Sequence, residues 1–265
     1  MRGHRMNPVA EIPLRSPVPW AQLLDYLRPR RVPGVEQVED VFQRRTGATT
    51  VRVAPDPLGH HLRVSADGPV VVADVLARIT RLFALDEDHA VARMHLQSCP
   101  LLAPRIARAP LLRPLGCWDR FELCVRTVLG QQVAVAAAGT LMQRLVDRCG
   151  EITPTSVMAA DLEGIGMPGA RVDTLRSLAA AHCEGRLCLH APWPQVDAAL
   201  RALPGFGPWT RAYLAIRLGR EPDAFPDVDV GLRRAVQADS PQALLRRAQA
   251  WRPYRSLAAS YLWMT

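Results

Sequence analysis

The feature that most constrains this fold is an eight-residue turn between two apolar helical patterns, Leu203-Pro204-Gly205-Phe206-Gly207-Pro208-Trp209-Thr210. Two glycines two residues apart permit a tight reversal with positive φ and leave the backbone open to a ligand. Amides of the turn and of the next helix's first residues can hold a phosphate oxygen without reading base sequence. The pattern predicts a helix-hairpin-helix at about 194–218, with phosphate-binding residues Gly205, Phe206, Gly207 and Thr210. A plain helix–helix turn is the alternative.

The charge of the chain points to a polyanionic partner. The formal net charge is +8 and the sequence pI is about 9.8, which is typical of nucleic-acid-binding proteins. From residue 201 to the end, ten arginines stand against five acidic residues, so this stretch carries +5 of the total. A solvated helical face would explain the same bias.

The distribution of apolar residues predicts an α+β fold with two parts. Residues 1–11 are expected to be a proline-rich tail, and residues 12–86 a small antiparallel-sheet domain. Its expected elements are strands at 35–41, 50–53 and 61–64 and helices at 20–27 and 70–85. Residues 87–265 are expected to be mostly helical, with a connector at 100–116 and helices near 121–129, 133–149, 170–184, 194–202, 208–218, 231–238, 241–251 and 254–264.

The turn does not stand alone, because several further segments form a family pattern with it. The hairpin followed by Phe225-Pro226-Asp227-Val228-Asp229-Val230-Gly231-Leu232 resembles the helix-hairpin-helix DNA glycosylase superfamily. Phe121 to Arg126 and Leu129-Gly130-Gln131-Gln132-Val133 resemble its DNA-3-methyladenine glycosylase II (AlkA) branch, and the resemblance covers nearly the whole chain from about Ile12. It implies a monofunctional glycosylase that flips an alkylated purine, of the 3-methyladenine or 7-methylguanine type, and hydrolyses its N-glycosidic bond in base excision repair.

An electron-rich aromatic wall suits a cationic base. Trp209 and Tyr213 lie four residues apart and so share one helix face, and the resemblance adds Tyr254 to this base pocket. Aromatic residues at such spacing also occur as ordinary core residues. The resemblance places the catalytic carboxylate shortly after the hairpin, where Asp229 fits best; it could stabilise positive charge at C1′ and orient water. A helix N-cap is the alternative role for Asp229, and Asp227 is a rival for either role.

The residue expected to fill the space left by the flipped base is Gln132. The resemblance places a wedge at this position, where well-known members of the family have an apolar side chain. An amide could fill the vacated stack and hydrogen-bond the orphaned base. A solvated residue at a helix junction is the alternative.

Two other functions compete with this interpretation. A bifunctional glycosylase/lyase needs a lysine near the hairpin, but every basic Lys/Arg side chain in this sequence is arginine, so no side-chain amine can form a Schiff base. A non-catalytic hairpin DNA-binding module would not need Asp229 and an aromatic pocket.

The expected partner is double-stranded DNA with alkylated bases, bound by a monomer. No apolar run reaches the roughly 18 residues of a membrane span, and no apolar segment follows the basic N-terminus, so we expect a cytoplasmic, nucleoid-associated bacterial enzyme. We expect no required cofactor, with a monovalent cation at the hairpin as the one option. His182, Cys183, Cys188 and His190 fit no common zinc spacing, so no metal site is expected there.

Overall fold

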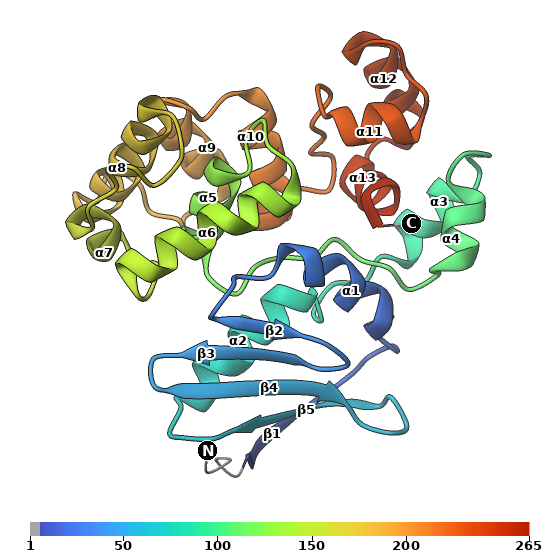
Figure 1. Cartoon of the computed structure of the whole chain (residues 1–265). Helices are drawn as coiled ribbons and strands as arrows, with labels where there is room; N and C mark the ends of the chain where they lie inside the picture. The colour runs from blue at the N-terminus through green and yellow to red at the C-terminus, as the bar shows by residue number, and fades with distance from the viewer. Residues whose placement is uncertain (1–5, 265) are drawn as a thin grey trace.

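The structure is a computed structural model that describes residues 6–264. At its N-terminal end five strands form one antiparallel sheet in the order β1-β5-β4-β3-β2. The strands are β1 (Asn7–Pro13), β2 (Glu36–Val38), β3 (Phe42–Thr46), β4 (Thr49–Pro55) and β5 (His61–Ala66). Helices α1 (Trp20–Leu27) and α2 (Val72–Phe83) share an apolar core with this sheet. Figure 1 shows α1 and α2 near the sheet, with the remaining helices above them.

The predicted tail over residues 1–11 is wrong for residues 7–11, which form most of β1; residues 1–5 lie outside the described part. Strand β1 pairs only with β5, at the edge of the sheet. An edge strand tolerates proline because one row of its amides needs no partner, and the register shifts between Pro8 and Ala10. The prolines in this segment therefore led to the prediction of a tail where the structure has an edge strand.

Strand β3 was also not predicted, because its sequence FQRRT carries no alternating apolar pattern. The inward side chain Arg44 is only 6% exposed and donates to the carboxylates of Glu36 and Glu122. Glu122 lies on α5 (Arg120–Leu129), so this buried ion-pair network joins the sheet to the helical region. The adjacent Arg44 lowers the pKa of Glu122 against the opposing effect of burial, so the glutamate stays ionised.

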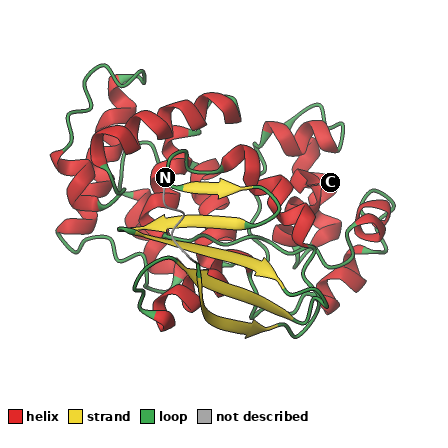
Figure 2. Cartoon of the chain, turned by 60° about the horizontal axis from the view of Figure 1, so that its bottom comes forward, coloured by secondary structure: helices red, strands yellow, loops and turns green. Residues whose placement is uncertain are grey.

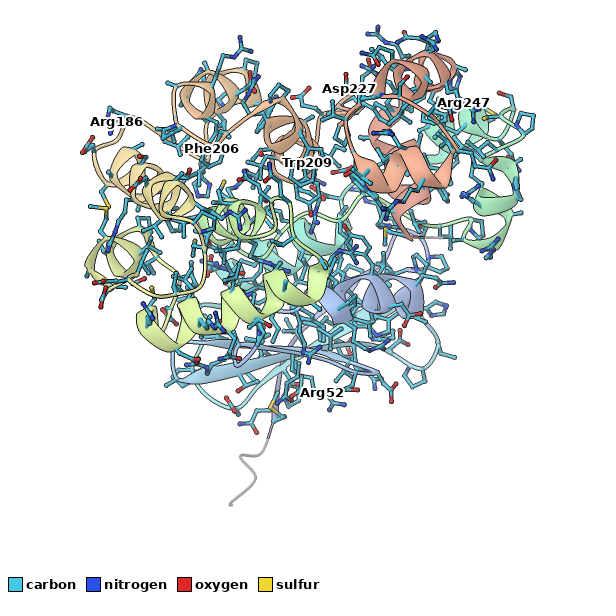
Figure 3. All side chains as sticks on the ribbon, turned by 45° about the horizontal axis from the view of Figure 1, so that its top comes forward. Arg52, Arg186, Phe206, Trp209, Asp227 and Arg247 are labelled. Carbon is cyan, nitrogen blue, oxygen red and sulfur yellow. The ribbon has the colours of Figure 1, made fainter. Side chains whose placement is uncertain are left out.

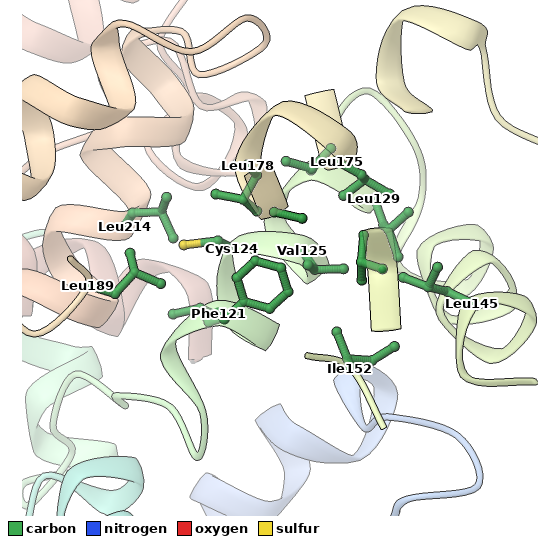
Figure 4. Close-up of a cluster of buried hydrophobic side chains, with 14 of the residues drawn as sticks. Phe121, Cys124, Val125, Leu129, Leu145, Ile152, Leu175, Leu178, Leu189 and Leu214 are labelled. Carbon is green, nitrogen blue, oxygen red and sulfur yellow. The ribbon is translucent and has the colours of Figure 1, made fainter. Parts of the chain in front are cut away.

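The helical region consists of two bundles, each with its own core (Figures 1 and 2). The first contains α5 together with α6 (Val135–Cys149), α7 (Pro154–Ala159), α8 (Gly169–Cys183), α9 (Trp193–Arg201), α10 (Pro208–Leu214) and a π-helical turn, Ala215–Gly219. Its core is drawn in Figure 4, where Phe121 and Cys124 of α5 lie among leucines of the surrounding helices.

The second bundle joins segments from opposite ends of the chain. Helices α3 (Ala90–Leu96) and α4 (Ala103–Arg108) pack against α13 (Arg255–Met264), and α11 (Val230–Ala235) and α12 (Pro241–Ala248) complete it. Residues 100–116 were predicted as a connector, but α4 forms inside them with Pro104 in its first turn, a position where proline lacks no needed hydrogen bond. The α+β architecture is confirmed.

Candidate active site

A cavity of about 480 Å³ opens between the two helical bundles. Its wall combines residues from the end of α1, from the α5–α6 junction, and from α10, α11 and α13. Figure 3 shows Trp209 on the first bundle at the side that faces the second. Segments that are distant in sequence therefore meet in one space, which is the usual arrangement of a ligand site.

An aromatic wall lines this cavity. The Trp209 and Tyr213 rings are stacked, with centroids 5.5 Å apart and an interplanar angle of 12°. Trp263 of α13 meets Tyr213 edge-on at 5.7 Å and also lines the cavity. A flat base could stack on such a surface.

The predicted third wall residue, Tyr254, does not join this group. Its ring packs edge-on against His95, with centroids 5.5 Å apart, and it lines a separate cavity of about 50 Å³. It precedes α13, whereas the cavity is reached only from the far end of that helix. Trp263 lines the cavity instead. No spacing pattern predicts this residue, because it lies 34 positions beyond Asp229 in the sequence.

Asp229 caps a helix and also lines the cavity. Its Oδ1 accepts the Leu232 amide at 2.7 Å and so caps α11, while its Oδ2 accepts the Trp209 indole N–H at 2.8 Å. The carboxylate lines the cavity beside the aromatic wall. The Trp263 indole N–H donates to Oδ1 as well, at 3.4 Å. Three donors on the carboxylate at a capped helix start fix the position of a negative charge. The rival Asp227 does not line the cavity.

The hairpin is built as the sequence predicted. Gly205 has φ +79°, and a Cβ there would lie 2.4 Å from the Thr174 hydroxyl oxygen. Gly207 caps α10 and a Cβ there would meet nothing within 4 Å. Both glycines are exposed, which leaves their amides accessible to a phosphate.

The side chains of the other two predicted phosphate-binding residues, Phe206 and Thr210, are buried. Phe206 is 4% exposed and belongs to the first bundle's core, and Thr210 is 3% exposed. The Thr210 hydroxyl accepts from the Gln131 side-chain amide at 3.0 Å. If these two residues bind a phosphate, as the sequence predicts, they would do so through their backbone amides rather than their side chains.

We expect Gly205→Ala to destabilise the protein by about 2–4 kcal/mol. The alanine would have to adopt a left-handed backbone conformation, and its methyl group would collide with Thr174. Gly207→Ala is the matched control, since its φ of −68° suits alanine and its Cβ has open space. Urea unfolding of both variants measures the difference. Equal stability losses would show that the hairpin geometry is not as described.

The two glutamines between α5 and α6 have different positions. Gln132 has φ +57° and is exposed, and no described residue hydrogen-bonds its side chain. Gln131 was not predicted to matter, yet its side-chain amide donates to the Gly205 carbonyl at 2.8 Å as well as to Thr210. Gln131 thus connects the hairpin to the segment that presents Gln132.

Comparison with known proteins identifies the family. Two family models match the chain: the AlkA N-terminal domain over residues 9–119, and the HhH-GPD superfamily base excision DNA repair protein over residues 125–241. The DNA-3-methyladenine glycosylase 2 of Escherichia coli (strain K12) is 34% identical over 274 residues, which cover 95% of each chain. The chain belongs to this AlkA family. It is a DNA-repair glycosylase of the helix-hairpin-helix type, and its partner is DNA.

A second relative and a solved structure are also similar to this chain. A probable bifunctional transcriptional activator/DNA repair enzyme AlkA of Mycobacterium tuberculosis is 34% identical over 96% of this chain, which spans only 56% of that longer protein. The solved 3-methyladenine DNA glycosylase of Archaeoglobus fulgidus superimposes with a TM-score of 0.82, at 19% identity, over 96% of this chain and 97% of that one. At that identity the likeness concerns the fold.

The described side chains and the hairpin carbonyls offer few ligands for a bound ion. Within residues 6–264, no group of three His, Cys, Asp or Glu residues is placed to hold a metal. At the hairpin, the Gly205 carbonyl already accepts from Gln131 and the Gly207 carbonyl from the Arg211 amide. A monovalent cation would depend on the remaining carbonyls there.

Among residues 6–264, no helix has the length and apolar character to cross a membrane.

Proposed function

We propose that this glycosylase excises alkylated purines from double-stranded DNA by flipping the base into the cavity and hydrolysing its N-glycosidic bond. The observation that carries this proposal is the pairing of the Asp229 carboxylate with the aromatic wall of Trp209, Tyr213 and Trp263 in one cavity. The name of the E. coli relative supports 3-methyladenine as one substrate.

Each part of the cavity has a defined task in this proposal. The aromatic wall stacks on the flipped base, and an N3- or N7-alkylated purine is cationic and so gains cation–π attraction. Asp229 faces the sugar, stabilises positive charge at C1′ and orients the attacking water. Extrusion of a base costs a few kcal/mol, least for damaged pairs.

The hairpin and Gln132 hold the DNA around the extruded nucleotide. Free amides of the hairpin bind a phosphate without regard to base sequence. Gln132 occupies the vacated stack, because its exposed position at the tight α5–α6 turn lets it project from the protein surface. We further propose that the enzyme acts as a monomer on cytoplasmic, nucleoid DNA.

We expect the enzyme to leave intact abasic sites. The chain contains no lysine, so no side-chain amine can form the imine that β-elimination requires. Methylated duplex treated with the enzyme should break only after alkali, and borohydride should trap no protein–DNA adduct. Breaks without alkali, or substantial trapping, would favour the bifunctional lyase instead.

If Gln132 fills the gap, Gln132→Ala should weaken binding to abasic-analogue DNA and slow base release by about 10-fold, while the unfolding free energy stays within about 0.5 kcal/mol of the wild type because the side chain is exposed. Fluorescence anisotropy and single-turnover release measure the two effects. Gln131→Ala is a contrasting variant, since it removes internal hydrogen bonds and should lower stability as well. Unchanged affinity and rate for Gln132→Ala would remove this residue from the mechanism.

A further inference from the structure

Arg217 stands behind the aromatic wall as a buried cation. It lies on the π-helical turn after α10, is 6% exposed and lines the cavity. Its Nε and Nη2 donate to the Gly116 carbonyl at 3.1 and 2.6 Å, and its Nη1 donates to the Tyr213 hydroxyl at 2.7 Å. No carboxylate within residues 6–264 forms an ion pair with it. Its charge is therefore directed at Tyr213 and the cavity.

The other arginines of the cavity wall differ from Arg217 in exposure or in charge partners. Arg126 also lines the cavity, but its guanidinium lies 4.0 Å from Glu36 and 3.9 Å from Glu122. Arg30 stacks on the Tyr26 ring, with its Cζ 3.9 Å from the ring centroid, and is half-buried, whereas Arg31 and Arg234 are exposed. Among the described arginines of the cavity wall, Arg217 is therefore the one that is buried without a carboxylate partner, and Asp229 supplies a negative charge to the same wall.

The position of Arg217 is fixed by the segment that holds it. The Gly116 amide donates to the Leu82 carbonyl at 3.0 Å, and a Cβ on Gly116 would lie 2.1 Å from the Arg81 carbonyl oxygen. Gly116 is thus tightly packed against the end of α2, and its carbonyl cannot follow Arg217 if the guanidinium moves. A charge held this rigidly needs no reorganisation during a reaction.

The tyrosines around Arg217 preserve its charge. Burial lowers the pKa of the Arg217 guanidinium. The neighbouring Tyr213 and Tyr26 raise this pKa by more than burial lowers it, so the net shift is upward. Burial likewise opposes ionisation of Tyr213, yet Arg217 and Arg30 outweigh it and its pKa falls below the usual tyrosine value. In Tyr26, burial and the neighbouring Tyr213 raise the pKa to about 12.

The reaction moves negative charge toward the base. When the C1′–N bond breaks, its electron pair goes to the base nitrogen, and water forms the new C1′–O bond and loses a proton. A cationic alkylpurine leaves as a neutral base and the proton goes to solvent. A neutral lesion base acquires negative charge, which that proton then cancels. In both cases the electron density on the base increases in the transition state.

We propose that Arg217, acting through Tyr213, is a specificity-determining residue that stabilises electron density arriving on the departing base and thereby extends excision to lesions whose base is neutral. This inference rests on the proposed function of the same cavity. A neutral base is bound without repulsion from Arg217 and gains its full stabilisation as the bond breaks. A cationic base is repelled in the bound state and needs less help to leave.

The test compares Arg217→Met with the wild type in single-turnover base release from two duplexes, one with a neutral hypoxanthine and one with a cationic 7-methylguanine. We expect the maximal rate on hypoxanthine to fall by about 100-fold, as when a preorganised donor to a developing anion is removed. The rate on 7-methylguanine should fall by about 10-fold or less, with tighter binding. Arg217→Lys keeps an amine but loses the two-donor contact with the Gly116 carbonyl, so its ratio of the two rates should lie between those of the wild type and Arg217→Met.

Tyr213→Phe guards against a folding defect in Arg217→Met, because it keeps the ring and removes only the hydroxyl that Arg217 contacts. It should shift the rate ratio in the same direction by a smaller factor. An unchanged ratio in the folded variants would overturn the proposal, as would a wild type that releases 7-methylguanine but no hypoxanthine. A wild type that releases no 7-methylguanine at all would instead refute the proposed function.

Discussion

Asp229→Asn should remove most base release, by about 100-fold or more, because in the proposed reaction it deletes the negative charge that stabilises positive charge developing on the sugar. The loss should be larger for lesions with poorer leaving groups, since a cationic methylpurine departs more readily unaided. Single-turnover rates on DNA with defined lesions measure this, and binding to abasic-analogue DNA should persist.

We also expect Asp229→Asn to lower the stability of the fold. The carboxylate accepts from the Leu232 amide and the Trp263 indole on Oδ1 and from the Trp209 indole on Oδ2. An asparagine offers one oxygen and must turn its NH₂ toward a donor on the other side. We therefore expect a stability loss of about 1–3 kcal/mol, which urea unfolding separates from the loss of catalysis. Asp227→Asn is the control for charge and should retain much more activity, because Asp227 lies outside the cavity wall. An inactive Asp227→Asn beside a normal Asp229→Asn would show that the wrong carboxylate was assigned.

Trp209→Ala should be the second most damaging change, with a loss of about 100-fold or more in base release. It removes the ring stacked on Tyr213 and also the N–H that donates to Asp229 Oδ2, so the stacking surface is lost and the carboxylate is held less firmly. Base–aromatic stacking alone is worth about 1–3 kcal/mol per base. Single-turnover release from 7-methylguanine DNA measures the effect.

Two further variants divide that loss into its parts. Trp209→Phe keeps an aromatic ring but not the indole N–H, so it should lose less than Trp209→Ala. Tyr254→Ala is the control for aromatic removal, since Tyr254 packs against His95 away from the cavity, and its base release should stay close to the wild type. A Tyr254→Ala variant as inactive as Trp209→Ala would contradict the position of the cavity.

The sequence predicted the parts of the fold that depend on local patterns. The hairpin could be predicted because the glycine spacing, Pro208 and the flanking apolar helices all act within about twenty-five residues. Strand β3 could not, because Arg44 is buried through ion pairs with Glu36 and Glu122 rather than through apolar contacts. Strand β1 was missed because proline argues against strands everywhere except at an edge.

The site was predicted only as far as the helix after the hairpin and the carboxylate beyond it. Trp209 and Tyr213 share one helix face, so their stacking follows from spacing. Arg217 continues this spacing, four residues after Tyr213. Trp263 lines the cavity because a second bundle meets the first there, which no local pattern records. The choice of Tyr254 failed for the same reason, since a residue at the start of α13 and one at its end face different cavities.

The most direct test of the central claim is chromatography of the bases that the purified protein releases from methylated double-stranded DNA, with each lesion quantified. The account predicts release of free 3-methyladenine and 7-methylguanine by the wild type and almost none by Asp229→Asn. Binding to the same DNA without release of any methylated purine would contradict it and favour a non-catalytic DNA-binding protein.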